Sequence, residues 1–283
     1  MTKTKSHQAK VPNQVKDHMV SGNVFSLVWE PGVRAYKTEP VPQDLSAYYH
    51  HEDYISHQED TPGFIAMVYR FVRNYNIKLK LSWLKSAQPP GNNLLDYGSG
   101  MGDFLSAAQN KFWNAQGIEV NESARSFAQK KGLTVYKNTQ ENAVGRYDVI
   151  TLWHVLEHLE DPVAMSQWFK ARLSDQGVLV VAVPNHRSWD AKFYQEYWAA
   201  YDVPRHLWHF SKESLEAIFA KDFEIIQTHP MWFDAIYVSL LSERYLKTKG
   251  SGARGILVGI WSNLNAIFSK EASSIAYVLK KRK

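Results

Sequence analysis

The chain has 283 residues, 45% of them hydrophobic, so it is long enough to bury one full core and to carry accessory segments. It contains no cysteine, which excludes disulfides, cysteine-ligated zinc and a cysteine nucleophile, and which suits the reducing cytoplasm where we expect the protein. The formal net charge of +5 is mild and gives weak support for nucleic-acid binding. The polar N-terminus and the absence of an apolar run of bilayer length predict neither a signal peptide nor a transmembrane segment.

Residues 1–90 are predicted to form a segment accessory to the main domain. Residues 1–13 are polar and without periodicity, so we expect them to be disordered. The pattern VFSLVWE at 24–30 predicts a strand, with a hairpin partner at 33–38. Apolar residues at helical spacing over 64–84 predict a long amphipathic helix that packs against the domain that follows.

Three histidines, His50, His51 and His57, stand in a stretch rich in tyrosine just before this helix. Neither cysteine nor a tight cluster of acids accompanies them, so the ligand set of a metal site is incomplete. We interpret the stretch as an aromatic surface loop.

The sequence LLDYGSGMGDFL at 94–105 contains the chain's densest run of glycine. Two leucines lead into Asp96, and glycine then occupies Gly98, Gly100 and Gly102 before an apolar-periodic segment begins. This pattern predicts a strand, a tight turn and a helix start. Glycine permits positive φ and lets a ligand approach the backbone. The spacing G-x-G-x-G differs from the dinucleotide fingerprint G-x-G-x-x-G.

The chain from this turn onward alternates strands with helices, which predicts an α/β, doubly wound, Rossmann-like sheet. A second short strand ends at Glu119, the position from which an acid hydrogen-bonds a ribose diol in nucleoside-binding sheets of this kind. YDVITLW is a nearly continuous apolar run typical of a buried central strand. The predicted later strands are LTVYKN, YDVITLW, GVLVVAVPN, FEIIQTHPMW and SSIAYVLKK, at 133–138, 147–153, 177–185, 223–232 and 273–281.

The order of these motifs resembles that of the class I S-adenosylmethionine (SAM)-dependent methyltransferases, a group that includes ubiquinone-biosynthesis O-methyltransferases. The resemblance spans 94–185 and continues through 205–219. It implies a methyltransferase domain over 91–283, with seven strands of which the seventh inserts antiparallel beside the sixth. Several bacterial relatives carry a cysteine zinc ribbon ahead of the core. The matching region here, 14–38, has no cysteine, so the resemblance implies a segment that has lost its metal.

The resemblance also implies a cofactor site for SAM, with S-adenosylhomocysteine as product. Asp96, Ser99 and the turn glycines would hold the amino-acid end of SAM. Glu119 would accept both ribose hydroxyls, because a carboxylate accepts two hydrogen bonds at once. Val120 would lie on the adenine. The full predicted set is Asp96, Tyr97, Gly98, Ser99, Gly100, Gly102, Glu119, Val120, Asn138, Thr139, Trp153 and His154.

HVLEH at 154–158 also fits H-x-x-E-H, a pattern of zinc proteases. That motif requires both histidines on one helix, whereas this one begins at the end of a predicted buried strand, so we reject a protease. Some ubiquinone-type relatives bind a divalent metal near this turn. An acid that they use matches His154 here, so we predict no metal requirement.

The segment 185–210 is too long for a simple crossover and is dense in Trp, Tyr and His, which favours a lid or substrate wall over a structural aromatic cluster. A general base is needed only where the acceptor must lose a proton. His206 is our first candidate for that role and His154 the second. Other acid/base candidates of the segment are Tyr201, Asp202 and His209.

The segment 233–269 is predicted to be a helical insertion, with two apolar helices separated by a break at GSGARG, 250–255. Four roles stay open for it: to cover a lipid-like acceptor, to form a homodimer interface, to touch a membrane surface peripherally, or to pack on the predicted long helix.

The sequence therefore predicts a SAM-dependent methyltransferase that acts on a small or lipid-like acceptor at oxygen. An RNA or DNA methyltransferase is the first alternative; the mild charge and the lack of an N/D-P-P-Y/F motif disfavour it. An NAD-dependent oxidoreductase is the second, and the glycine spacing disfavours it. A SAM-binding protein without catalysis stays open, because fold alone names no substrate.

Overall fold

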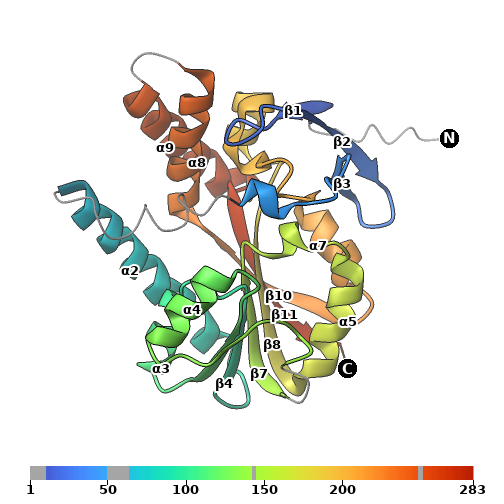
Figure 1. Cartoon of the computed structure of the whole chain (residues 1–283), viewed down its shortest axis with the longest axis vertical. Coiled ribbons are helices and arrows are strands. Elements are labelled where there is room, and N and C mark those ends of the chain that lie inside the picture. Colours follow the sequence, from blue (N-terminus) through green and yellow to red (C-terminus); the bar gives the residue numbers. More distant parts are fainter. Residues whose placement is uncertain (1–10, 50–63, 142–144, 248–250, 283) are drawn as a thin grey trace. The chain divides into compact units, whose positions relative to one another are not determined.

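The computed structural model describes residues 11–49, 64–141, 145–247 and 251–282 (Figure 1). The predicted disorder at 1–13 and the interpretation of His50, His51 and His57 as a loop fall largely or wholly outside these residues.

The chain divides into two compact units, and each combines three stretches of sequence. The large-sheet unit consists of 50–183, 215–229 and 276–283. The small-sheet unit consists of 1–49, 184–214 and 230–275. The division into domains at 1–90 and 91–283 stays a prediction.

The large-sheet unit is built on a seven-stranded mixed sheet with strand order β10-β11-β8-β7-β4-β5-β6. β11 lies between β8 and β10, which confirms the expected place of the last strand. The strands from β8 to β6 pair in parallel. Their bounds are β4 Asn93–Tyr97, β5 Asn114–Ile118, β6 Val135–Tyr136, β7 Tyr147–Trp153, β8 Leu173–Pro184, β10 Phe223–Pro230 and β11 Ser274–Lys281.

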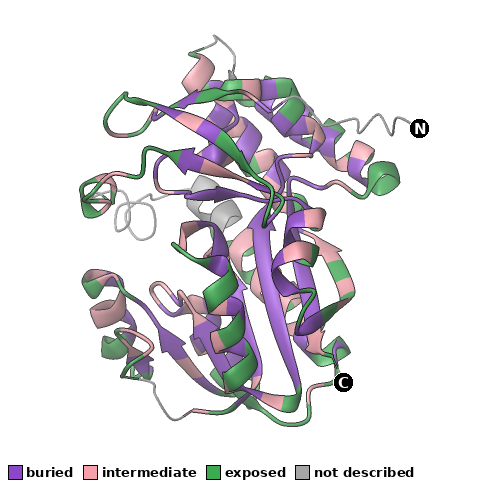
Figure 2. Cartoon of the chain, turned by 90° about the vertical axis from the view of Figure 1, so that its right-hand side faces the viewer, coloured by how far each residue is buried: buried purple, intermediate pink, exposed green. Residues whose placement is uncertain are grey.

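Helices pack on both faces of this sheet, as its continuous apolar strands require. Leu94 packs in one core with Leu84, Phe104 and Ala128, which come from three helices on one face. Tyr97 points to the opposite face, because side chains alternate along a strand, and its ring packs against the Trp168–Phe169 pair of α5. The helices are α2 Phe64–Ser86, α3 Asp103–Gln109, α4 Glu122–Lys130, α5 Pro162–Arg172 and α7 Lys212–Phe219. The sheet is thus doubly wound, and Figure 2 shows its central strands buried over most of their length.

The parallel register of three neighbouring strands brings their carboxyl ends together. Asp96 of β4 pairs with Gly117 of β5 on one side and with Thr151 of β7 on the other. The residues that follow these strands therefore meet at one edge of the sheet, the edge where open α/β sheets bind ligands.

The small-sheet unit contains a four-stranded sheet with order β1-β2-β3-β9. β2 and β3 form the antiparallel hairpin that the sequence predicts. The bounds are β1 Gln14–Lys16, β2 Val24–Glu30, β3 Ala35–Glu39 and β9 Trp208–His209. Helices α6 Trp189–Tyr194, α8 Trp232–Leu246 and α9 Ser251–Ser269 complete the unit.

The segment 185–210 contains α6 and two 3₁₀ turns, and its Trp198 and Tyr201 are buried in the core of the unit. Its role as a lid or substrate wall stays a prediction. The break expected at 250–255 is wrong in part, because α9 already begins at Ser251. Gly255 serves close packing rather than interruption, because a Cβ on it would lie 3.0 Å from the Leu240 Cα of α8.

No helix among the described residues is long and apolar enough to cross a bilayer.

Candidate cofactor site

The glycine turn after β4 has the backbone conformation that only glycine adopts readily. φ is +77° at Gly98, +53° at Gly100 and +81° at Gly102. A Cβ on Gly98 would lie 2.4 Å from Val155 Cγ2, whereas a Cβ on Gly100 would meet no atom of the described residues within 4 Å. Gly98 therefore lets the turn pack, and Gly100 leaves an open backbone surface for a ligand.

Ser99 presents a buried hydroxyl at this turn. Its Oγ has no hydrogen-bond partner among the described residues. Gly117 makes room for it, because a Cβ there would lie 2.5 Å from Ser99 Oγ. A buried hydroxyl without a partner costs free energy, so this atom is suited to a ligand that supplies the missing hydrogen bond.

Glu119 follows β5 and is held in a fixed orientation by backbone amides. Its Oε2 accepts a hydrogen bond from Gly100 N and its Oε1 one from Asn121 N, both at 2.8 Å. Arg125 donates to the Glu119 carbonyl at 2.9 Å. Each carboxylate oxygen keeps a further lone pair. The carboxylate can therefore accept two additional hydrogen bonds, as a vicinal diol would donate.

Asp96 is buried at the end of β4. Burial raises its pKa to about 7, against the opposing effects of a hydrogen bond from Thr151 and the charge of Lys80. Thr151 Oγ1 donates to Asp96 Oδ1 at 2.7 Å. A cationic ligand beside this carboxyl would favour its charged form.

The end of β7 adds an aromatic and a charged group to the same unit. The Lys80 ammonium lies 4.3 Å from the centre of the Trp153 ring. His154 follows with φ +58°, and its Nδ1 is 3.4 Å from Oε1 of the buried Glu157. His154 and His158 do not share an α-helix, because only Leu156–His158 is helical and it is a single 3₁₀ turn. The structure therefore excludes the helix-borne zinc-protease motif.

For the remaining predicted cofactor residues, Val120, Asn138 and Thr139, we describe no contact with Asp96, Ser99 or Glu119. Val120 is exposed, so its side chain is accessible to a ligand. Asn138 Oδ1 accepts hydrogen bonds from the backbone amides of Gln140 and Glu141 and so holds its own turn. Thr139 is partly buried in that turn. The roles of these residues, and of Tyr97 with its ring on α5, stay predictions.

Four of the predicted acid/base residues, Tyr201, Asp202, His206 and His209, lie in the small-sheet unit. His209 is fully buried, which holds its pKa well below the usual value, and its Nε2 is 2.9 Å from Thr38 Oγ1. Burial raises the pKa of Tyr201, so this phenol stays protonated. His206 Nδ1 lies 2.9 Å from the Ala200 carbonyl, and its Nε2 lies 3.7 Å from Asp202 Oδ2. His206 and Asp202, two of these four candidates, thus lie beside each other.

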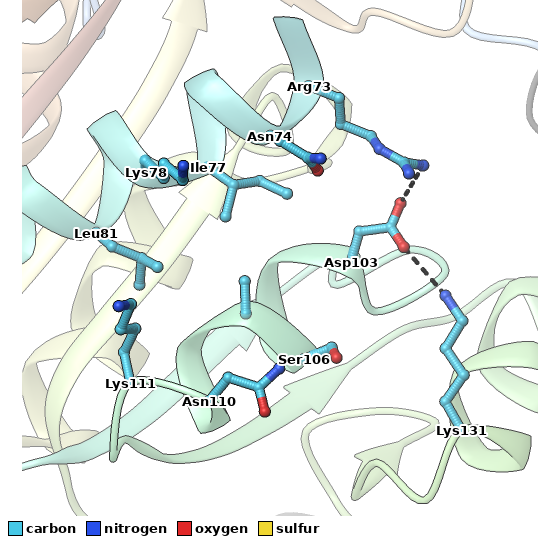
Figure 3. Close-up of a pocket in the computed structure, with 11 residues that line it drawn as sticks. Arg73, Asn74, Ile77, Lys78, Leu81, Asp103, Ser106, Asn110, Lys111 and Lys131 are labelled. Atoms are coloured by element: carbon cyan, nitrogen blue, oxygen red, sulfur yellow. Dashed lines mark hydrogen bonds and ion pairs between the residues drawn. The ribbon is translucent and has the colours of Figure 1, made fainter. Parts of the chain in front are cut away.

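Asp103, which directly follows the glycine turn, binds other residues of the protein instead of joining the site. Its carboxylate forms two ion pairs, one with Arg73 Nη1 of α2 at 3.1 Å and one with Lys131 Nζ at 3.0 Å (Figure 3). The three side chains border a groove of about 420 Å³ between α2 and α3. Asp103 thus connects α2 to the turn.

Two residues of the site, Thr151 and Lys80, were not predicted from the sequence. Thr151 was detectable, because it is the one threonine in β7 and lies between apolar residues. Lys80 could not be predicted, because nothing in the sequence of α2 indicates that this lysine lies near Trp153 and Asp96 in the folded chain.

The sequence model of a family described as "Methyltransferase domain" matches residues 54–228. A ubiquinone biosynthesis O-methyltransferase of Actinobacillus pleuropneumoniae serotype 7 (strain AP76) is 33% identical over 109 residues, which cover 34% of this chain and 47% of that protein. The chain spans about half the length of the curated relatives it matches.

Solved structures with the same fold include two complexes with SAM or its product. A magnesium protoporphyrin IX methyltransferase from Synechocystis PCC 6803 with bound S-adenosylhomocysteine aligns at a TM-score of 0.52 and 15% identity, over 80% of this chain and 90% of that one. A phosphoethanolamine N-methyltransferase 2 from Haemonchus contortus in complex with SAM aligns at 0.50 and 16%, over 84% and 57%. These likenesses establish the fold.

Proposed function

From the premise that this chain belongs to the methyltransferase-domain family, we propose that it transfers the methyl group of SAM to an oxygen of a small or lipid-like acceptor. The chain carries a methyltransferase domain of the class I, SAM-dependent fold. The observation that carries the proposal is a group of three features at the carboxyl edge of the sheet. They are the Ser99 hydroxyl, which has no hydrogen-bond partner in the described part of the chain, the open surface of Gly100 and the fixed Glu119 carboxylate.

The chemistry of these groups fits SAM. Glu119 would accept the two ribose hydroxyls with its remaining lone pairs, and Ser99 would supply a hydrogen bond to the polar amino-acid end. Asp96 would face the cationic part of the ligand. When bound, SAM supplies an activated methyl group for in-line displacement. The protein contributes proximity and exclusion of water to that reaction.

Methylation at oxygen is supported by the relative whose printed name is an O-methyltransferase of ubiquinone biosynthesis. A phenol or alcohol must lose its proton during transfer, so this acceptor class calls for a base. We assign that role first to His206, whose Nε2 lies 3.7 Å from the Asp202 carboxylate, and second to His154. The absence of a metal requirement belongs to the same proposal: activity is expected to survive a chelator, and loss that magnesium restores would contradict it.

The test of the cofactor is calorimetric titration of the wild type with SAM, S-adenosylhomocysteine and NAD. We expect micromolar binding of the first two, weakened at least about tenfold in Glu119→Ala through loss of two hydrogen bonds to a charged group. Glu122→Ala is the matched control, since it removes an exposed carboxylate three residues further along the chain. Binding of NAD instead of SAM would contradict the proposal.

A further inference from the structure

Helix α9 has its small residues inside and its large apolar residues outside. Gly255, Gly259, Ser262 and Ala266 are buried. A Cβ on Gly259 would lie 2.6 Å from Ile236 Cα of α8, so the two helix backbones approach each other closely. Small residues at this spacing allow helices to pack without large side chains between them, which leaves the bulky residues of α9 for the other face.

The outer face of α9 is formed by large apolar side chains. Leu257 is 67% exposed, Trp261 54% and Phe268 86%. They recur every three or four residues and therefore share one face of the helix. We call this set the α9 apolar face; it consists of Ile256, Leu257, Ile260, Trp261, Leu264, Ile267 and Phe268.

Aromatic residues of α6 extend this face. Trp189 lies edge-on to Trp261 with ring centroids 6.5 Å apart. Phe193 stacks on Trp189 at 5.1 Å and is itself 41% exposed. The Arg254 guanidinium lies 5.4 Å from the Phe193 ring. Aromatic rings beside basic groups are the composition of a membrane–water interface.

The exposed charges on the helices of this face have one sign, although Glu196, two residues beyond α6, is an exposed acid. Among the described residues of α6, α8, α9 and the residues that end α8 and α9, every exposed charged side chain is basic: Lys192, Arg244, Lys247, Arg254 and Lys270. The acids of these helices are buried or partly buried. Glu243, for example, accepts a hydrogen bond from Tyr194 at 2.9 Å and pairs with Arg254 at 3.3 Å.

We propose that the α9 apolar face rests on an anionic phospholipid surface, with α9 lying in the plane of the interface. Burial of the apolar side chains and attraction between the basic residues and lipid phosphates would act together. A second copy of the chain is disfavoured as the occupant. A two-fold interface places the same patch on both partners, so it would bring the basic residues around each face near one another.

The test is co-sedimentation of the full chain with vesicles of phosphatidylcholine alone and of an equal mixture with phosphatidylglycerol. Neither SAM nor an acceptor is needed, so the result is independent of the proposed reaction. We expect binding to the anionic vesicles, weakened at least about tenfold in Leu257→Glu and Trp261→Glu, because a charge replaces buried apolar area. Lys192→Gln and Lys270→Gln should each weaken it up to about fivefold.

Phe112→Glu is the matched control, since Phe112 is 88% exposed and lies in the large-sheet unit. It should bind vesicles as the wild type does. The altered side chains are exposed, and circular dichroism verifies that each variant is folded. Absence of wild-type binding, or equal binding by Leu257→Glu, would overturn the proposal. The proposal would also be overturned if the wild type does not bind vesicles but forms a dimer in sedimentation equilibrium, and if Leu257→Glu dissociates that dimer.

Discussion

Asp96 links cofactor binding to pH. Its pKa of about 7 means that the carboxyl is partly protonated near neutrality in the free protein. A cationic ligand favours the carboxylate, so SAM binding should release a proton. Because the folded-state pKa is raised, the carboxyl favours the folded state in acid, and that contribution is lost as the pH rises through about 7.

We therefore expect SAM affinity to rise by up to about tenfold per pH unit between about pH 6 and pH 7 and then to level off. Titration calorimetry in two buffers of different ionisation enthalpy measures both the affinity and the released proton. Asp96→Asn should bind weakly and without pH dependence. Thr151→Val, which removes a hydrogen bond to the carboxylate, should move the midpoint to higher pH. A flat profile in the wild type would exclude Asp96 from the cofactor's charged end.

His206 is the residue for which binding and turnover should separate. His206→Ala is expected to keep SAM affinity and to lose about a hundredfold or more in turnover, the usual contribution of a general base. Single-turnover methylation and SAM titration on the same sample measure the two effects. His154→Ala is the comparison, because it removes the second candidate base. Unchanged turnover in His206→Ala would remove this histidine from the mechanism.

The site was only partly predictable at this scale. The glycine turn, Asp96 and Glu119 follow from local pattern, because strand ends and glycine spacing are visible in the sequence. The burial of Tyr201 and His209 is not visible, since an aromatic-rich segment has the same composition in a lid as in a core. Burial raises the pKa of Tyr201, so its phenol keeps its proton, and burial lowers the pKa of His209, so its imidazole binds a proton weakly. Both side chains are therefore poor general bases.

The glycine turn shows how one short element divides its work between packing and binding. Gly98→Ala should cost about 3 kcal/mol or more, because a left-handed conformation and a 2.4 Å clash with Val155 add together. Gly100→Ala should cost only about 1–2 kcal/mol, since its Cβ enters open space, yet it should weaken SAM binding strongly. Chemical denaturation and calorimetry on the pair measure this contrast; equal stability losses would contradict it.

Elements were predictable where one periodicity extends over several residues. The strands at Val24–Glu30 and Tyr147–Trp153 match their predicted bounds. β1 and β9 were missed, because two or three residues carry no period and their pairing partners lie elsewhere in the chain. The break expected at 250–255 was wrong in part for a similar reason: the close approach of Gly255 to α8 is a tertiary property that the sequence does not show.

At the scale of the whole molecule, each unit has its own hydrophobic core. In the small-sheet unit, Asp190 of α6 joins three other segments, because its carboxylate accepts hydrogen bonds from Ser262 at 2.7 Å, Trp198 at 2.8 Å and Ser273 at 2.6 Å. Asp190→Ala would leave three buried donors without their acceptor. We expect a loss of about 3 kcal/mol or more in the free energy of unfolding.

Urea denaturation of Asp190→Ala measures that loss. Asp234→Ala, which changes a partly buried acid of α8 in the same unit, is the control and should cost much less. A small effect of Asp190→Ala would mean that the three donors find other partners.

The exposed side chains of the α9 apolar face also have a practical consequence. A surface that carries Leu257, Trp261 and Phe268 in one row adheres to any apolar material when its natural covering is removed. Extracts made without detergent should therefore lose this protein to aggregates and to container walls, while mild detergent should keep it dispersed. The side chains that we propose to bind the membrane surface would thus also determine the conditions under which the protein can be purified.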